Sequence, residues 1–243
     1  MAKGVSIRIG TSGWAYKHWE GVFYPVRWPK SKWLEHYIGH FDTVELNASF
    51  YRLPNRTTFK NWKARTPENF LWSVKGRRFI THTRRLENPA EPLKRLYGVT
   101  AGLEEKLGVI LFQLPPSLAF DEEVFREFCR SLDPQVRHAV EPRHPSWMNH
   151  KAFHLLGEFN MALCTADPAG PFPSCNAITA DFVYIRLHGS RELYASKYSE
   201  AELQTWAEKV AVWNRDAFIY FNNDVKGHAV NNAKRLKEIL GVK

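Results

Sequence analysis

The sequence predicts an α/β fold, a single closed (β/α)8 TIM-like barrel that occupies residues 1–243. Short apolar segments alternate with helical patterns about eight times, which is typical of a parallel sheet with helices between its strands. The length of 243 residues suits a closed barrel, which typically needs about 250. An open doubly wound sheet is the main alternative, but neither a GxGxxG nor a GxxxxGKS/T motif occurs.

Several of the predicted strands end in polar or charged residues. The fourth reads GVILFQLPP, the fifth VRHAVEPRH, the seventh VYIRLHG and the eighth AFIYFNND. Buried parallel strands have this apolar character, and their polar ends indicate a site at the carboxyl edge of the sheet. The predicted strands are 6–10, 43–47, 71–75, 108–113, 137–141, 161–164, 183–188 and 218–222.

Helical patterns lie between most of these strands. Segment 92–106 forms one helix or two, because Gly98 and Gly102 interrupt it. Segment 199–213 opens with Ser199 followed by Glu202, the spacing of a capping box. Residues 167–179 are rich in proline and predict a loop between the sixth and seventh strands. The predicted helices are 31–40, 57–65, 92–106, 121–132, 151–159, 199–213 and 229–240.

The three cysteines, Cys129, Cys164 and Cys175, show no CxxC spacing, and an odd number argues against a disulfide framework. A reducing, cytoplasmic location is therefore expected. No run of about 18 apolar residues occurs, and the start MAKGVSIRIG has no apolar signal-peptide core. We expect no membrane segment.

The net charge of +9 is unevenly distributed. Residues 1–120 contain 19 Lys and Arg against 9 Asp and Glu, whereas residues 121–243 contain 15 against 16. A basic patch attracts phosphates, nucleic acid or acidic metabolites. A solvated basic face without a ligand is the alternative. The patch consists of Lys75, Arg77, Arg78, Arg84 and Arg85, with His82 among them.

In a TIM barrel the functional groups come from the loops that follow the strands. We therefore predict that the polar strand ends meet at the barrel mouth. The predicted catalytic residues are Glu45, Lys75, Glu141 and His188. The predicted substrate-binding residues are Trp14, Tyr16, Asn47, Tyr51, His82, Gln113, Arg143, Trp147, Arg186, Asn222, Asn223 and Asp224. For Trp14, Tyr51 and Trp147, stacking on a ligand and packing of the loops both remain open.

Charged residues at a barrel mouth suit acid/base chemistry on an anionic compound. One glutamate would act as general acid or base, with its pKa raised by partial burial. Arg186 and Lys75 would hold an anionic group, and His188 would transfer protons near neutral pH. A buried ion-pair network that merely fills the top of the barrel is the alternative.

Other chemistries are less favoured. Oxygen and imidazole ligands for a divalent metal are available in Glu45, Glu141, His188 and Asp224, but no metal motif such as HExxH occurs and nearby cations would repel a metal. We predict no metal site and leave the cofactor open. A Schiff base on Lys75 is disfavoured, because neighbouring carboxylates would raise its pKa. Glu45 and Glu141 as a glycosidase pair remain a minor option.

Seven segments resemble, in order, those of the domain-of-unknown-function 72 (YecE-like) family: GTSGWAYKHW, VELNASFYRLP, SVKGRRFITH, LFQLPPS, AVEPRHPSW, YIRLHG and YFNNDVKGHAVNNA. The resemblance covers roughly residues 7–240, and it implies a TIM-barrel fold but no established reaction. The positions that match include every catalytic and substrate-binding residue predicted above, together with Phe50.

Two functions follow. The first is an enzyme that acts on an anionic, ring-containing small molecule, a sugar phosphate or a nucleotide, by carboxylate acid/base chemistry. The second is a nucleic-acid-binding protein or endonuclease-like barrel that uses the basic, aromatic rim. Two observations disfavour nucleic-acid binding: the second half of the chain is not basic, and no RNA-binding motif occurs.

Overall fold

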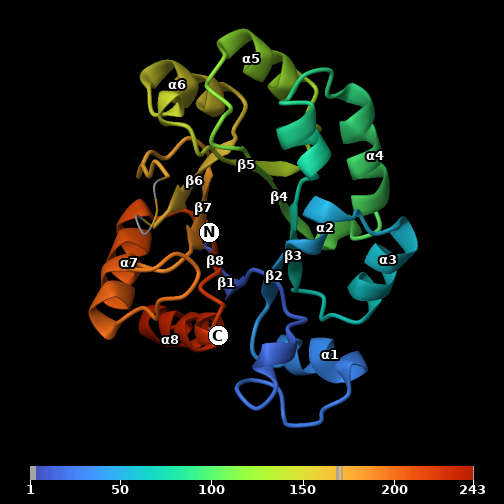
Figure 1. The fold of residues 1–243 in the computed structure, drawn as a ribbon, viewed down its shortest axis with the longest axis vertical. Helices are drawn as coiled ribbons and strands as arrows, with labels where there is room; N and C mark the ends of the chain where they lie inside the picture. Colours follow the sequence, from blue (N-terminus) through green and yellow to red (C-terminus); the bar gives the residue numbers. More distant parts are fainter. Residues whose placement is uncertain (1–3, 168–169, 171, 243) are drawn as a thin grey trace.

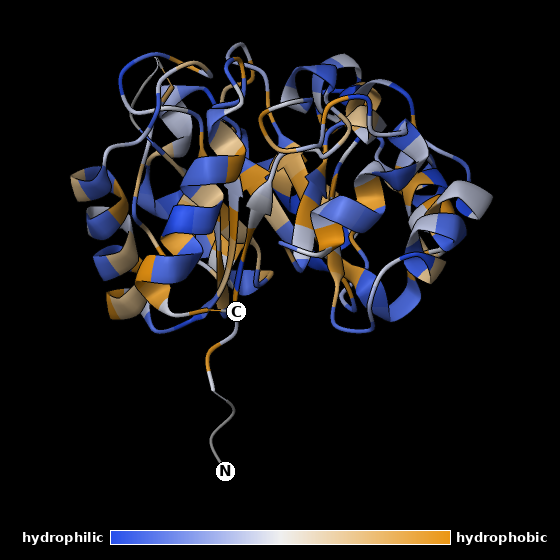
Figure 2. Ribbon diagram, turned by 90° about the horizontal axis from the view of Figure 1, so that it is seen from below, coloured by the Kyte–Doolittle hydropathy of each residue, from blue (hydrophilic) through white to orange (hydrophobic). Residues whose placement is uncertain are grey.

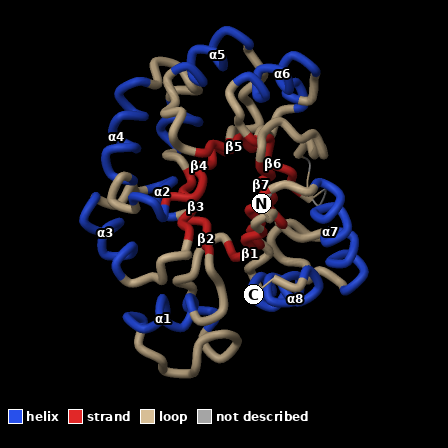
Figure 3. The backbone as a smooth tube through the Cα atoms, turned by 180° about the vertical axis from the view of Figure 1, so that it is seen from behind, coloured by secondary structure: helices blue, strands red, loops and turns tan. Residues whose placement is uncertain are grey.

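The computed structural model describes residues 4–167, 170 and 172–242. Eight parallel strands follow one another round a barrel, with helices on its outside (Figures 1 and 3). This arrangement confirms the predicted (β/α)8 barrel. The strands are β1 (Ile7–Thr11), β2 (Thr43–Leu46), β3 (Leu71–Lys75), β4 (Leu107–Gln113), β5 (Arg137–Glu141), β6 (Ala162–Ala166), β7 (Phe182–Leu187) and β8 (Asp216–Phe221).

The seam between β1 and β2 is joined by one bridge, between Ser12 and Glu45, whereas the other neighbouring strands form ladders. A Cβ at Gly10 would lie 2.3 Å from the carbonyl oxygen of Thr43, so a glycine is needed for the strands to approach this closely. The Tyr37 hydroxyl donates to the same carbonyl at 3.0 Å. Side chains therefore help the main chain to close the barrel here.

Helices follow most strands and pack against the outside of the barrel. The capping box predicted at Ser199 and Glu202 is present, and Asp121 caps its helix through two main-chain N–H groups. The helices are α1 (Trp33–Ile38), α2 (Ala48–Tyr51), α3 (Arg56–Ala64), α4 (Ala90–Thr100), α5 (Glu122–Arg130), α6 (His150–Glu158), α7 (Glu200–Trp213) and α8 (His228–Leu240).

Three local features refine the predicted helices. Segment 92–106 divides into α4 and a 3-10 turn at Glu104–Lys106. Between β6 and β7 the described residues contain no helix, which agrees with the predicted loop, although residues 168, 169 and 171 lie outside the described residues. The sequence did not predict α2 or the π-helical turn Phe79–Thr83, which follow β2 and β3 at the carboxyl end of the barrel.

The apolar core has two layers. The larger one lies between the strands and the helices, whose outer faces are hydrophilic (Figure 2). The smaller one fills the interior of the barrel and consists of Val109, Leu111, Ala139, Ala162, Cys164, Phe182, Tyr184, Phe218 and Tyr220. Next to this inner layer, the strands present charged side chains at their carboxyl ends. No helix in the described part of the chain has the length and hydrophobicity that a membrane span requires.

Candidate functional site

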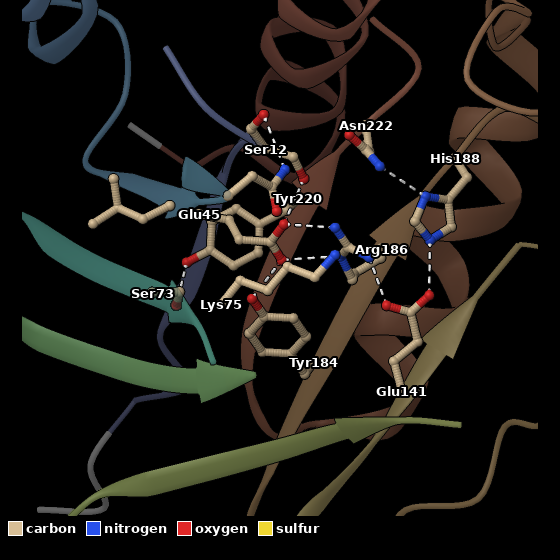
Figure 4. Close-up of polar contacts among 12 residues, drawn as sticks. Ser12, Glu45, Ser73, Lys75, Glu141, Tyr184, Arg186, His188, Tyr220 and Asn222 are labelled. Atoms are coloured by element: carbon tan, nitrogen blue, oxygen red, sulfur yellow. Dashed lines mark hydrogen bonds and ion pairs between the residues drawn. The ribbon is translucent and has the colours of Figure 1, made fainter. Parts of the chain in front are cut away.

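Arg186, on β7, lies between two glutamates inside the carboxyl end of the barrel (Figure 4). Its Nη2 and Nε donate to Oε1 and Oε2 of Glu45 at 2.8 and 3.0 Å. Its Nη1 donates to Oε2 of Glu141 at 2.5 Å. Ser12 and Tyr184 donate hydroxyl hydrogen bonds of 2.8 and 2.7 Å to Glu45. All these side chains are buried, so strands β2, β5 and β7 are joined through one desolvated charge network.

Both glutamates are ionised. Burial raises the pKa of each carboxyl, but for Glu45 the charge and hydrogen bonds of Arg186, the hydrogen bond from Tyr184 and the charge of Lys75 together outweigh burial and lower the pKa. The pKa of Glu141 is lowered further, because His188 and Arg143 act together with Arg186. The prediction of a glutamate with a raised pKa is therefore wrong. A glycosidase pair needs one protonated carboxyl, which neither residue supplies.

His188 connects this network to the loop after β7. Its Nε2 lies 3.3 Å from Glu141 Oε1, and its Nδ1 lies 3.1 Å from Asn222 Nδ2. Burial lowers the pKa of His188, so its imidazole is neutral near pH 7 and its partners assign the proton to Nε2. Asp167 accepts the main-chain N–H groups of His188 and Gly189 at 3.0 and 2.9 Å, which fixes the start of that loop.

Lys75 ends β3 and pairs with no carboxylate of the described residues. Its Nζ lies 4.3 Å from the centroid of the Phe50 ring, and no ion pair to it is found among the described residues. Burial, followed by the positive charge of Arg186, lowers the pKa of Lys75 to about 8, although Glu141 and Glu45 act in the opposite direction. The predicted net rise of the Lys75 pKa is wrong, because burial and the charge of Arg186 together outweigh the two carboxylates.

A cavity of about 670 Å³ opens at this end of the barrel. Arg186 forms part of its wall, whereas Glu45 and Glu141 contact Arg186 from behind that wall and His188 contacts Glu141. The predicted site residues that line the cavity are Tyr16, Asn47, Tyr51, Lys75, His82, Gln113, Arg143, Arg186, Asn222 and Asp224. The structure thus brings most of the predicted ligand-binding residues into one place.

Three predicted ligand-binding residues do not reach the cavity. The Trp14 ring packs edge-on against Trp72 at a centroid distance of 5.3 Å. Trp147 is 1% exposed and donates its indole N–H to a main-chain oxygen at 2.9 Å. The Asn223 side chain is fully buried, and its Nδ2 donates to the main-chain oxygen of Ser196 at 3.0 Å. In this structure these three side chains therefore pack within the protein and do not line the cavity.

Six further residues line the cavity but were not among the predicted site residues, and three of them carry polar side chains: His18, Arg78 and Tyr194. The other three are Phe50, Pro116 and Val225. His18 Nε2 lies 2.8 Å from Oδ2 of Asp224, whose Oδ1 accepts the Trp19 indole N–H at 2.6 Å. Burial raises the pKa of Asp224. Two of these polar residues could have been found from the sequence, because His18 follows the first strand and Arg78 belongs to the basic patch. Nothing in the sequence indicated that Tyr194 would line the cavity.

The side chains that could have supplied metal ligands are not gathered at one point. Glu45 and Glu141 bind Arg186, while Asp224 binds His18. Across residues 4–167, 170 and 172–242, no three His, Cys, Asp or Glu side chains are grouped so that they could hold a metal ion. The charged groups at the cavity are instead mainly cationic.

The model of the family described as "Protein of unknown function DUF72" matches residues 8–243. The chain belongs to this family. The UPF0759 protein YunF of Bacillus subtilis (strain 168) is 27% identical over 271 residues, which cover 97% of this chain and 95% of YunF. The UPF0759 protein YecE of Escherichia coli (strain K12) is 24% identical and covers 80% of this chain and 82% of YecE. These names state no reaction.

Solved structures agree on the fold of this DUF72 chain. A crystal structure of a DUF72 family protein from Thermotoga maritima MSB8 has a TM-score of 0.88 and 30% identity, covering 97% of this chain and 99% of that one. A DUF72 family protein from Enterococcus faecalis V583 has a TM-score of 0.84 at 20% identity, and the match covers 98% of this chain and 96% of that one. A methyltransferase from Methanosarcina mazei, at 10% identity and a TM-score of 0.55 with 99% and 94% covered, shares the fold alone.

Proposed function

We propose that this protein is an enzyme whose cavity binds an anionic, ring-containing small molecule, a sugar phosphate or a nucleotide, and acts on it by general acid/base chemistry. The observation that carries the proposal is that Lys75, Arg143 and Arg186 line one cavity, while ionised glutamates hold Arg186 from outside it. The volume of about 670 Å³ lies within the range of about 300–1,000 Å³ that is typical of small-molecule sites.

The arginines are placed to bind an anion. Three of the N–H groups of Arg186 donate to glutamates, so of the five in a guanidinium two are left for a ligand. The polar contacts of Arg143 with the described residues are long, 3.4 Å to Glu141 and 3.3 Å to the Tyr194 hydroxyl, and its guanidinium lies 4.2 Å from the centroid of the Phe172 ring. Such partly engaged guanidinium groups suit two-point binding of a phosphate or a carboxylate.

Aromatic side chains at the same cavity favour a ligand that contains a ring. Tyr51 is 79% exposed, and Phe50 packs perpendicular to it at a centroid distance of 5.0 Å. Tyr16 and Tyr194 line the cavity as well. An exposed tyrosine beside cationic groups offers a surface on which a sugar or a base stacks while its phosphate reaches the arginines.

The acid/base groups that line the cavity include Lys75, His82 and the pair formed by His18 and Asp224. Burial lowers the pKa of His82 to about 4, so we assign the proton transfers to Lys75 and the pair. A lysine with a pKa of about 8 exists in both protonation states near neutral pH, as a general acid or base requires. Glu45 and Glu141 remain essential in this proposal, but as positioning residues that hold Arg186.

Nucleic-acid binding is the second candidate, because cationic and aromatic residues continue outside the cavity. The guanidinium groups of Arg77 and Arg84 lie 6.0 and 5.4 Å from the ring of Phe79, which is 37% exposed. A single strand that stacks on Phe79 and Tyr51 would use the same rim. The dependence of binding on salt separates this candidate from the first.

Thermal-shift measurements with glucose phosphate, adenosine monophosphate and a single-stranded oligonucleotide test the proposal. A ligand at one hundred times its Kd stabilises a protein by about 2.7 kcal/mol. We expect shifts with the phosphorylated compounds, none with glucose or adenosine, and loss of the shifts in Arg143→Gln. The control is Arg215→Gln, an exposed arginine just before β8 at the opposite end of the barrel.

Two results would count against the proposal. Equal shifts in Arg143→Gln and Arg215→Gln would place the anion elsewhere. A shift seen only with the oligonucleotide, whose affinity falls by about 0.7 log units per log unit of salt for each phosphate contacted, would favour the second candidate.

A further inference from the structure

Lys75 stands apart from the other buried charges of the barrel. Glu45, Glu141 and Arg186 satisfy one another, but the Lys75 ammonium has no salt-bridge or hydrogen-bond partner in the described part of the chain. Its side chain lines the cavity, and its Nζ lies over the face of Phe50. A lysine amine that is desolvated, not paired with a carboxylate and close to a second cation is the arrangement that activates lysine as a nucleophile.

We propose that Lys75 is a covalent catalytic residue, whose amine forms an imine with an aldehyde or ketone group of the anionic ligand. This inference rests on the proposed function and narrows its substrate class to anionic carbonyl compounds. Arg143 and Arg186 line the same cavity as Lys75, so a ligand held there through its phosphate or carboxylate brings its carbonyl carbon to the amine.

The reaction balances without an oxidant or a reductant. The Nζ lone pair attacks the carbonyl carbon, and the C=O π electrons move to the oxygen, which takes up a proton. The nitrogen then releases a proton, its lone pair forms the C=N bond as the C–O bond of the carbinolamine breaks, and the oxygen leaves as water with a second proton. The iminium nitrogen finally releases its remaining proton, so no proton is gained or lost overall. One imine and one water are formed. His18 and Asp224, which also line the cavity, form a hydrogen-bonded pair that can exchange these protons with the ligand.

Borohydride trapping with pyridoxal phosphate as the probe tests the inference, since reduction fixes the imine as a stable amine. Peptide mapping of the intact protein would compare Lys75 with Lys226, an exposed lysine close to Val225 at the same cavity. We expect Lys75 to be modified at least about tenfold faster at neutral pH, because a far larger fraction of its amine is unprotonated than in an ordinary lysine with a pKa of about 10.4.

The rate of labelling should rise with pH to a plateau above about pH 8 for Lys75 but continue to rise well beyond it for Lys226. Burial is the largest cause of the lowered pKa of Lys75, and the charged groups that also act on it are Arg186 on β7, Glu141 and Arg143 at the end of β5, and Glu45 on β2. A Lys75→Arg variant keeps the charge but should lose the fast adduct, whereas Lys226→Arg should keep it. Circular dichroism would confirm that both variants are folded.

The outcomes separate this inference from the proposed function. Fast labelling of Lys75 by pyridoxal phosphate but not by pyridoxal supports both. Equally fast labelling by both aldehydes supports the imine and contradicts anion binding. If Lys75 is labelled no faster than Lys226, the imine proposal is overturned. In that case, stabilisation of the protein by glucose phosphate would still support the anion-binding site.

Discussion

Arg186 and Glu45 form a two-point ion pair, with Nη2 donating to Oε1 at 2.8 Å and Nε donating to Oε2 at 3.0 Å. The pair joins β7 to β2 across the inside of the barrel. Because this geometry uses the planar fork of a guanidinium, a lysine at position 186 would not reproduce it. The guanidinium of Arg186 therefore compensates the buried charges of the glutamates and also forms part of the cavity wall.

Replacing Arg186 with methionine should destabilise the protein strongly. The change leaves buried Glu45 without its cation and buried Glu141 with only the long contact to Arg143, which costs about 3–5 kcal/mol of the free energy of unfolding. Urea denaturation measures this loss. Arg235→Met is the matched control, because it breaks only exposed pairs with Glu200 and Glu238 and should change stability little. Equal losses in the two variants would contradict the central role of Arg186.

Acid should destabilise the fold through the same network. The pKa values of Glu45 and Glu141 are lower in the folded protein than their usual 4.5, so the folded state binds fewer protons on them than the unfolded state does. Their stabilising contribution is therefore complete above about pH 4.5 and is lost as pH falls through the folded pKa values. Urea denaturation from pH 7 to pH 3 should show this loss of stability. The free energy of unfolding of Glu45→Gln should fall less over the same range, because one of the two titrating carboxyls is absent. If the free energy of unfolding fell equally steeply with pH in both proteins, the loss in acid could not be assigned to Glu45.

Gly189 should not tolerate a side chain. It has a φ of 109°, and a Cβ there would lie 2.5 Å from the main-chain oxygen of Glu192. Gly189→Ala is expected to reduce the free energy of unfolding by about 1–3 kcal/mol and to disturb the loop that carries Tyr194. The control is Gly98→Ala within α4, where no atom lies within 4 Å of the added carbon and a gain of about 0.5–1 kcal/mol is expected. Denaturation curves that showed no difference between the variants would exclude this strain.

Tyr51 and Trp147 should respond in opposite ways to substitution. Tyr51→Ala removes an exposed ring from the cavity, so it should weaken the thermal shift with adenosine monophosphate and leave stability nearly unchanged. Trp147→Phe leaves the carbonyl of Leu118 without its indole donor, which should cost about 1–3 kcal/mol of stability without altering the ligand shift. The reverse pattern would show that the two aromatic residues have been assigned the wrong roles.

The barrel could be predicted from the sequence because its strands are apolar and separated by turns and helical patterns. The same logic placed Glu45, Glu141 and Arg186 at one end, since each lies at or near the carboxyl end of its strand. It could not show that Arg186 contacts both glutamates, because that depends on the stagger of strands far apart in the chain. The predicted rises in the pKa values of the glutamates and of Lys75 were wrong, because the sequence did not show that Arg186 lies among these groups inside the barrel.

The aromatic residues show a second limit. Trp147 and Tyr51 both follow strands, yet one is buried in the wall and the other is exposed at the cavity. The path of each loop decides this difference, and residue type alone does not encode the path. Tyr194 lies far enough from its strand that only the folded loop brings it to the cavity.

The link between Ser12, Glu45 and Arg186 also bears on how the chain folds during synthesis. Glu45 lies in the first quarter of the chain, but Tyr184 and Arg186, which bind it, are made much later. A nascent chain that ends before β7 has no cation for this carboxylate and must keep it in water. The first strands therefore cannot close into a dry half-barrel ahead of the rest, and the formation of the ligand cavity coincides with the last step of closure.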